Sequence, residues 1–150
     1  MCRSLLALAA TVLLPMGAGA QELTPDQQEV WDFVEECWDA VLHDDSSTLM
    51  NCFHEDYTFW WSEDVLPFGK EFVGRIVPIN LPIEDIAVID IRPARIVVRG
   101  DVAIVHWGAR WFVRSPEGPL EPIVERVAMT LIRENGRWSY LGGGGSPLKY

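Results

Sequence analysis

The sequence predicts an α+β domain in which helices come first and long antiparallel strands follow. A capped segment with apolar residues at helical spacing begins near residue 24. From residue 86 onward the chain is rich in β-branched residues and is divided by turn signals. Because no internal repeat or linker interrupts the 150 residues, we expect one domain of this class.

Residues 1–20 have the composition of a secretory signal peptide. Arg3 precedes an apolar run from Leu5 to Leu14, and a small-x-small tripeptide ends at Ala20. The run is too short for a membrane-spanning helix, which needs roughly 20 apolar residues. We therefore expect a domain over residues 21–150, a periplasmic or secreted location, and no membrane contact after cleavage.

The charge of the chain argues against one class of partner. The sequence holds 12 basic and 22 acidic residues, which gives a formal net charge of −10. Binding to nucleic acid depends on lysines and arginines that displace counterions from the phosphate backbone. An acidic chain repels that backbone, so we expect no nucleic-acid partner.

Two cysteines remain in the expected mature domain. Cys37 lies in the first predicted helix and Cys52 in the second, nearly equidistant from a turn at residues 44–45. In a helical hairpin these side chains could face each other, and oxidising conditions would favour a disulfide. Such a bridge would add roughly 3 kcal/mol for a loop of about 15 residues. Two buried free thiols are the alternative.

The helices are predicted from capping signals and spacing. Thr24 suits the N-cap, Pro25 the first helical position, and Gln27 the closing position of a capping box. After a short break, a second helix is predicted over about residues 47–53, and a short third helix around residues 70–74. Helices therefore occupy the first half of the domain.

The strands are predicted from alternation and turns. Alternation begins at Tyr57 and returns in three long segments, residues 86–99, 102–114 and 123–133. Pro93 predicts a bulge or a bend in the first of these segments, and Asn135-Gly136 predicts a tight hairpin before the last strand. The glycine run 142–145 is expected to end that strand.

Three segments carry a resemblance to a known family. They are the helix-to-strand passage 47–59, the segment Gly100–Val105, and the segment Arg133–Trp138. Their order and spacing resemble the NTF2-like superfamily, which includes SnoaL-like polyketide cyclases, ketosteroid isomerases and the association domain of calcium/calmodulin-dependent kinases. The resemblance implies a curved sheet that wraps the helices into a cone, a pocket at its open end, and a homodimer formed through the sheet.

The resemblance does not fix a function, because one scaffold hosts several chemistries. The SnoaL-like and association-domain branches commonly carry His-x-Ser in the last strand, whereas this chain has Gly144-Gly145-Ser146 there. Chemistry that depends on that histidine is therefore not expected. The glycines would widen the pocket or let the strand bend.

The segment 102–114 offers two opposite arrangements. Alternate residues of a strand point to opposite faces of the sheet. Trp107 and Trp111 belong to one set of alternate residues, which is wholly apolar, and His106 and Arg110 belong to the other set. Hydrophobicity alone turns the indoles toward the core. The resemblance implies the reverse, because in association domains the arginine that matches Arg110 lines the cavity. A partner subunit would then cover the Trp107 and Trp111 face. We adopt the second arrangement as the working prediction.

The catalytic candidates follow from that choice. His106 would titrate near neutrality and act as acid or base, and Arg110 would bind a carboxylate or enolate oxygen. Asp56 is the second catalytic candidate, although it equally suits a turn in which it accepts backbone hydrogen bonds. Glu125 is a ligand-binding candidate at the mouth of the cone, or a structural partner for a basic neighbour.

Aromatic residues complete the candidate binding site. Tyr57, Trp31 and Trp61 are candidates to contact a ligand, with core packing as the alternative for each. No histidine or carboxylate spacing suits a metal, and no phosphate loop or nucleophile elbow is present in the sequence, so no metal or cofactor is expected.

These observations predict a domain that binds a partly apolar small molecule. Arg110 would favour a ligand that also carries an anionic group. The first alternative is an enzyme of the isomerase or dehydratase kind with His106 or Asp56 as base. The second alternative is a structural dimeric assembly domain.

Overall fold

The computed structural model describes residues 22–82, 85–115 and 118–148, with the backbone alone described for residues 115 and 118–121. The signal peptide expected over residues 1–20 lies outside the described residues. Helices precede the long strands, as predicted. The elements are α1 (Pro25–Leu42), α2 (Ser46–Asn51), β1 (Phe53–Trp61), β2 (Phe68–Gly69), α3 (Lys70–Asn80), β3 (Ile86–Arg99), β4 (Val102–Ser115), β5 (Gly118–Glu134) and β6 (Arg137–Pro147).

The predicted capping box begins α1. The Gln27 backbone N–H donates to Thr24 Oγ1 at 3.4 Å, and the Thr24 backbone N–H donates to Gln27 Oε1 at 3.0 Å. The Gln27 amide also donates from Nε2 to the Ile96 carbonyl at 2.8 Å. Because Ile96 lies in β3, the edge strand of the sheet, this bond fixes the start of α1 against that edge.

A disulfide joins the first two helices. Cys37 in α1 and Cys52 at the end of α2 are bonded, with Cα atoms 6.1 Å apart. The second helix ends at Asn51, earlier than predicted, because Phe53 already pairs with Tyr140 of β6. The bridge therefore joins the helical hairpin just before the chain enters the sheet.

The third helix is longer than predicted. It extends over Lys70–Asn80 and includes Pro78, instead of ending near residue 74. Val73 is buried in the main core and Val77 packs against it, so the inward face continues past the predicted end. Tertiary packing thus extends a helix that the glycine and proline content of this region disfavours.

The six strands form one sheet in the order β2-β1-β6-β5-β4-β3. All neighbouring pairs are antiparallel except β1 and β6, which run parallel. The glycine run does not end the last strand: residues 142–145 continue inside β6 and pair with residues 58–61 of β1. The expectation of a strand end there was wrong, because the ladder to β1 keeps the glycines extended.

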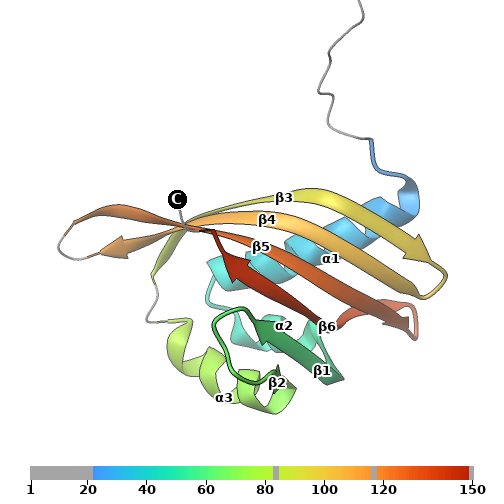
Figure 1. The fold of residues 1–150 in the computed structure, drawn as a ribbon, viewed down its shortest axis with the longest axis horizontal. Coiled ribbons are helices and arrows are strands. Elements are labelled where there is room, and N and C mark those ends of the chain that lie inside the picture. Colours follow the sequence, from blue (N-terminus) through green and yellow to red (C-terminus); the bar gives the residue numbers. More distant parts are fainter. Residues whose placement is uncertain (1–21, 83–84, 116–117, 149–150) are drawn as a thin grey trace, which may run out of the picture.

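The sheet curves around the helices (Figure 1), and α1 runs behind β3, β4 and β5 in that view. The register of β3 against β4 shifts between Pro93 and Arg95, which confirms the predicted bulge. The core lies between the sheet and the helices and includes Val30, Val34 and Leu131, all fully buried. We call the helix-facing side of the sheet the inner face and the opposite side the outer face.

Candidate functional site

An inner cavity of about 210 Å³ lies between α1, β1 and the inner face of β4, β5 and β6. Its walls are mainly aromatic and aliphatic side chains. Six lining residues also carry side-chain nitrogen or oxygen atoms: Trp38, Tyr57, Trp61, Trp107, Glu125 and Tyr140. An apolar hollow with a few polar groups is the usual form of a small-molecule site.

Alternation along β4 decides which side chains reach this cavity. Trp107 and Ala109 are buried on the inner face, whereas His106 and Arg110 are exposed on the outer face. The prediction that His106 and Arg110 look into the cavity is therefore wrong. The physical reason is that the wholly apolar set of alternate residues in β4 buries its apolar area when it faces the helices, and this burial stabilises the fold.

The face that holds Trp107 and Trp111 is covered by the chain's own helices. Trp107 is 3% exposed and belongs to the main core. Trp111 packs edge-on against Trp38 of α1, with ring centroids 6.4 Å apart. The expectation that a partner subunit covers this face was wrong, because α1 already occupies that position.

Glu125 places a carboxyl group in the inner cavity. It lies in β5 opposite Ala109 of β4 and Pro147 of β6, and it is 7% exposed. Within the described residues, no side chain or backbone group forms a hydrogen bond or ion pair with its carboxylate. Because burial disfavours the charged form, the pKa of Glu125 is raised to about 7. This carboxyl can therefore gain or lose a proton near neutral pH.

Two further polar atoms in the cavity wall lack a partner. Tyr140 is 4% exposed, and neither its hydroxyl nor Trp107 Nε1 has a hydrogen-bond partner among the described residues. The two rings stack with centroids 6.3 Å apart. Burial, and then the nearby Tyr57, raise the pKa of Tyr140 above its usual range, so the phenol stays protonated. Buried polar atoms without partners are uncommon and need an explanation.

An aromatic ladder on β1 forms another wall. Tyr57, Phe59 and Trp61 alternate inward and stack with centroids 6.3 and 6.1 Å apart. Burial raises the pKa of Tyr57 above its usual range, which keeps its hydroxyl protonated as well. A Cβ on Gly145 would meet the Trp61 ring and lie 3.2 Å from Phe59 Cζ. Gly145 therefore leaves room for the ladder.

Of the other predicted site residues, Asp56 and Trp31 lie away from the cavity. The Asp56 side chain is 85% exposed, and its backbone N–H donates to His54 Nδ1 at 3.0 Å. Asp56 therefore does not line the inner cavity. Trp31 is buried in the core, and its indole donates to Glu35 Oε1 at 2.7 Å. The structure favours the core interpretation for Trp31, because it does not line the cavity.

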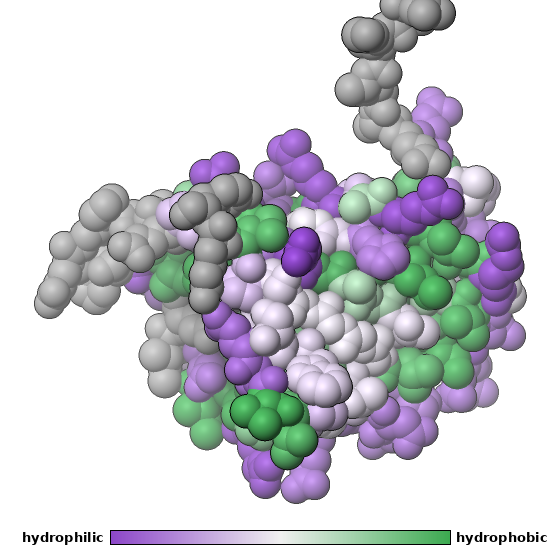
Figure 2. Space-filling view, viewed as in Figure 1, coloured by the Kyte–Doolittle hydropathy of each residue, from purple (hydrophilic) through white to green (hydrophobic). Residues whose placement is uncertain are grey.

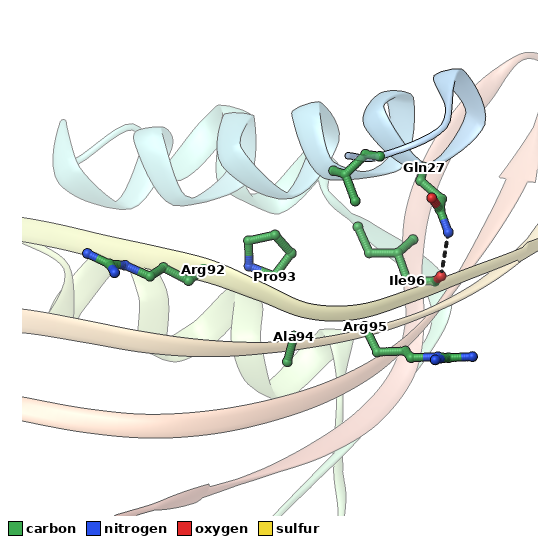
Figure 3. A pocket seen from close by; sticks show the side chains of 7 residues that line it. Gln27, Arg92, Pro93, Ala94, Arg95 and Ile96 are labelled. Carbon is green, nitrogen blue, oxygen red and sulfur yellow. Dashed lines mark hydrogen bonds between the residues drawn. The ribbon is translucent and has the colours of Figure 1, made fainter. Parts of the chain in front are cut away.

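A second hollow, of about 360 Å³, lies between the start of α1 and the edge strand β3. Figure 3 shows Pro93 turned toward α1, while Arg92 and Arg95 extend in opposite directions along the strand. The carbonyl of Ile96 in this hollow already accepts the bond from Gln27. Because its arginines are exposed and its wall holds no buried titratable group, the inner cavity is the stronger candidate site.

Two kinds of feature are absent from the part of the chain that the structure describes. No group of three or more histidine, cysteine, aspartate or glutamate side chains is placed to hold a metal ion. None of the described helices is both long enough and apolar enough to cross a membrane.

Sequence reasoning found part of this site and missed the rest. Tyr57, Trp61 and Glu125 were named as binding candidates, and all three line the cavity. Trp107 and Tyr140 were not named as binding candidates. The apolar parity of β4 was the signal for Trp107, whereas Tyr140 shares a parity with the buried Trp138.

Comparison with known proteins supports the fold. No protein-family model matches this sequence, and a comparison with curated proteins finds no relative. Among solved structures, a ketosteroid isomerase-like protein from Erwinia carotovora atroseptica is similar, with a TM-score of 0.69 and 12% identity over 85% of this chain and 100% of that chain.

Two further structures have the same architecture. An NTF2-like protein from Cytophaga hutchinsonii has a TM-score of 0.65 and 16% identity, covering 83% of this chain and 100% of its own. An NTF2-like protein with a cystatin-like fold from Novosphingobium aromaticivorans has a TM-score of 0.65 and 14% identity, covering 83% and 82%. At these identities the likeness concerns the fold alone. The chain therefore has the NTF2-like fold, an α+β cone of helices and a curved sheet.

Proposed function

We propose that this protein binds a compact, neutral, ring-bearing molecule with a carbonyl or hydroxyl oxygen in the inner cavity. The observation that carries the proposal is the set of polar groups without a partner among the described residues, Glu125, Tyr140 and Trp107, in a mainly apolar wall. A ligand oxygen would accept from the Tyr140 hydroxyl or from Trp107 Nε1, which removes the cost of leaving those donors unpaired.

The size of the cavity limits the ligand. A volume of about 210 Å³ compares with about 150 Å³ for an engineered protein cavity that binds benzene. One ring with a small substituent fits this space. The aromatic ladder of β1 would pack against the ring, and the apolar contact would supply most of the binding free energy.

Electrostatics favour a neutral ligand. The anionic option depended on Arg110, which lies on the outer face. Glu125 is the titratable carboxyl in the cavity wall, and above its pKa of about 7 it would repel an anion. A neutral ligand avoids this repulsion at every pH.

The location of the protein is part of the proposal. The signal-like segment 1–20 supports a periplasmic or secreted protein. The disulfide between Cys37 and Cys52 is consistent with an oxidising compartment.

Cyclohexanone and cyclohexanecarboxylate form a matched pair of probes for the binding proposal. We expect cyclohexanone, and not the carboxylate at about pH 8, to shift the NMR signals of cavity residues. Tyr140→Phe keeps the ring and removes the hydroxyl, so it should weaken cyclohexanone binding roughly two- to tenfold. His106→Ala, on the outer face, is the matched control and should leave binding unchanged. Equal binding of both probes, or no effect of Tyr140→Phe, would contradict the proposal.

A second candidate function is proton transfer next to a carbonyl, as in an isomerase. It is favoured by the pKa of about 7 for a buried carboxyl that shares a cavity with an unpartnered phenol. A general base is most effective when its pKa lies near the working pH. Glu125 takes the role that was predicted for His106 or Asp56, and Tyr140 would donate to the enolate oxygen.

Exchange of cyclohexanone α-protons in deuterated buffer tests this second function. Glu125 would accept a proton from the carbon next to the carbonyl, and a deuteron would return to that carbon. We expect the wild-type protein to accelerate the loss of the α-proton signal and Glu125→Gln to abolish the acceleration. His106→Ala and Asp56→Asn should exchange as the wild type does. Binding without exchange would retain the first function and exclude the second.

A further inference from the structure

A trough of about 890 Å³ crosses the outer face of the sheet. It runs from Ala94 of β3 across β4, β5 and β6 to Trp60 of β1. Five strands at a spacing of about 4.8 Å span roughly 19 Å. Small residues form its floor, among them Gly108 and Gly144. In Figure 2 residues of intermediate hydropathy, drawn pale, cover the centre of the view, with hydrophobic residues beside them and hydrophilic ones mainly around the rim.

The trough carries positive charge, although the chain as a whole has a net charge of −10. His106 and Arg126 line it and are exposed. Arg95 lies directly opposite His106 on β3, and Arg92 lies opposite Gly108. Within the described residues, Arg92 forms an ion pair with Asp90 at 3.2 Å, while no carboxylate pairs with Arg95 or Arg126. Unneutralised cations gathered on one face of an acidic protein favour an anionic partner.

The side chain of Arg126 is already oriented. Its Nε–H donates to Ser146 Oγ on the neighbouring strand at 2.9 Å. This bond leaves the two terminal nitrogens of the guanidinium available, and that edge matches the two oxygens of a carboxylate.

At the β1 end of the trough the wall is aromatic. Trp60 is 55% exposed, and its indole nitrogen donates to the Asp64 carbonyl at 3.1 Å. That bond fixes the ring, so its open face can pack against a flat apolar group without a large loss of side-chain freedom.

We propose that this trough is a second binding site, distinct from the inner cavity, for a small organic carboxylate with a flat apolar body. Arg126 binds the carboxylate through its free guanidinium edge, and the body lies over the glycine floor toward Trp60. The site has a ligand preference opposite to that of the inner cavity, because its charged groups are cations in contact with water.

A second copy of the chain suits this face less well. A homodimer formed through the outer face about a twofold axis would withdraw the unpaired guanidiniums of both copies from water, and a buried charge without a partner is unfavourable. The resemblance nevertheless implied a homodimer formed through the sheet, so the experiment must distinguish a second copy on this face from a bound carboxylate.

The test uses the full domain with 2-naphthoate and its neutral analogue 2-naphthamide. Binding would be followed by backbone amide NMR shifts at Gly108 and Gly144, and affinities by calorimetry. We expect 2-naphthoate to shift both amides and 2-naphthamide not to do so. Arg126→Gln should weaken 2-naphthoate roughly tenfold or more. Arg137→Gln removes an exposed arginine that does not line the trough and should leave the affinity unchanged.

Four results would overturn the proposal: no binding of 2-naphthoate at millimolar concentration, equal binding of the amide, wild-type affinity in Arg126→Gln, or shifts confined to the inner cavity. Light scattering on the same samples identifies the competing occupant. A dimer that persists in the presence of 2-naphthoate and dissociates in Arg126→Glu would mean that a second copy covers the trough, and would also overturn the proposal.

Discussion

The inner and outer faces of β4 and β5 are built from neighbouring residues with opposite properties. Trp107 and Glu125 point inward, where they line a small apolar cavity. His106 and Arg126 point outward, where they line an open trough. One residue along β5 separates the buried carboxyl of Glu125 from the exposed guanidinium of Arg126, and one residue along β4 separates the buried Trp107 from the exposed His106.

The contrast shows how strand parity governs ligand preference. On the inner face the charged form of Glu125 is desolvated, which raises its pKa and favours a neutral ligand. On the outer face the guanidinium of Arg126 stays in contact with water and keeps its charge. The same two strands can therefore present a neutral-selective site and an anion-selective site.

The largest expected effect comes from truncating the two neighbours on β4. Trp107→Ala removes a buried indole and should lower the free energy of unfolding by about 3–5 kcal/mol. His106→Ala removes an exposed side chain and should change it by less than about 0.5 kcal/mol. Urea denaturation of both variants measures the difference. Equal effects would mean that the two faces do not differ in burial as described.

Removal of the disulfide should have the next largest effect. The bridge between Cys37 and Cys52 joins the helices that cover the inner face. For a separation of 15 residues, the double change Cys37→Ser and Cys52→Ser should cost roughly 3 kcal/mol. Denaturation of the wild type with and without reductant provides the control. A variant as stable as the wild type would show that the bridge is not needed to keep the helices on that face.

Stability should depend on pH through Glu125. In the folded protein its pKa is about 7, compared with an ordinary value of 4.5, so the folded state binds more protons than the unfolded state between these values. The free energy of unfolding should therefore fall as pH rises from about 4.5 to about 7, by about 3 kcal/mol in total.

The variant Glu125→Gln should lose this fall and be more stable than the wild type at about pH 8. Glu36→Gln, which changes an exposed helix carboxylate, is the matched control and should keep the wild-type profile. A wild-type profile in Glu125→Gln would show that this carboxyl is solvated in the folded protein.

The smallest expected effect is on the outer face. Arg126→Gln removes an exposed guanidinium that donates a hydrogen bond to Ser146 Oγ. The free energy of unfolding should change by less than about 0.5 kcal/mol, although binding of an organic carboxylate should weaken. A large loss of stability would mean that Arg126 has a structural role instead of a binding role.

Local signals predicted the parts of the fold that depend on a few adjacent residues. The capping box at Thr24 and Gln27 formed as expected. The Asn135-Gly136 turn also formed, with φ values of 52° and 77° that this dipeptide tolerates well. Each feature depends on contacts within a few residues, which the sequence displays directly.

The inner face could be predicted only in part. Hydrophobicity alone predicted correctly that the apolar residues of β4, including Trp107, face the core. The resemblance to association domains led to the opposite prediction. The parallel pairing of β1 with the glycines of β6 joins segments about 80 residues apart, and periodicity carries no information on such pairing. Tyr140 precedes these glycines in β6 and pairs with Phe53 of β1, so its alternation with the buried Trp138 was not enough to place it at the cavity.

A carbon-detected NMR titration of the Glu125 side-chain carboxyl tests the central claim most directly. We predict a pKa of about 7 in the free protein and a change in this value when cyclohexanone binds. A titration near 4.5 that cyclohexanone leaves unchanged would contradict a buried, unpartnered carboxyl in the binding cavity.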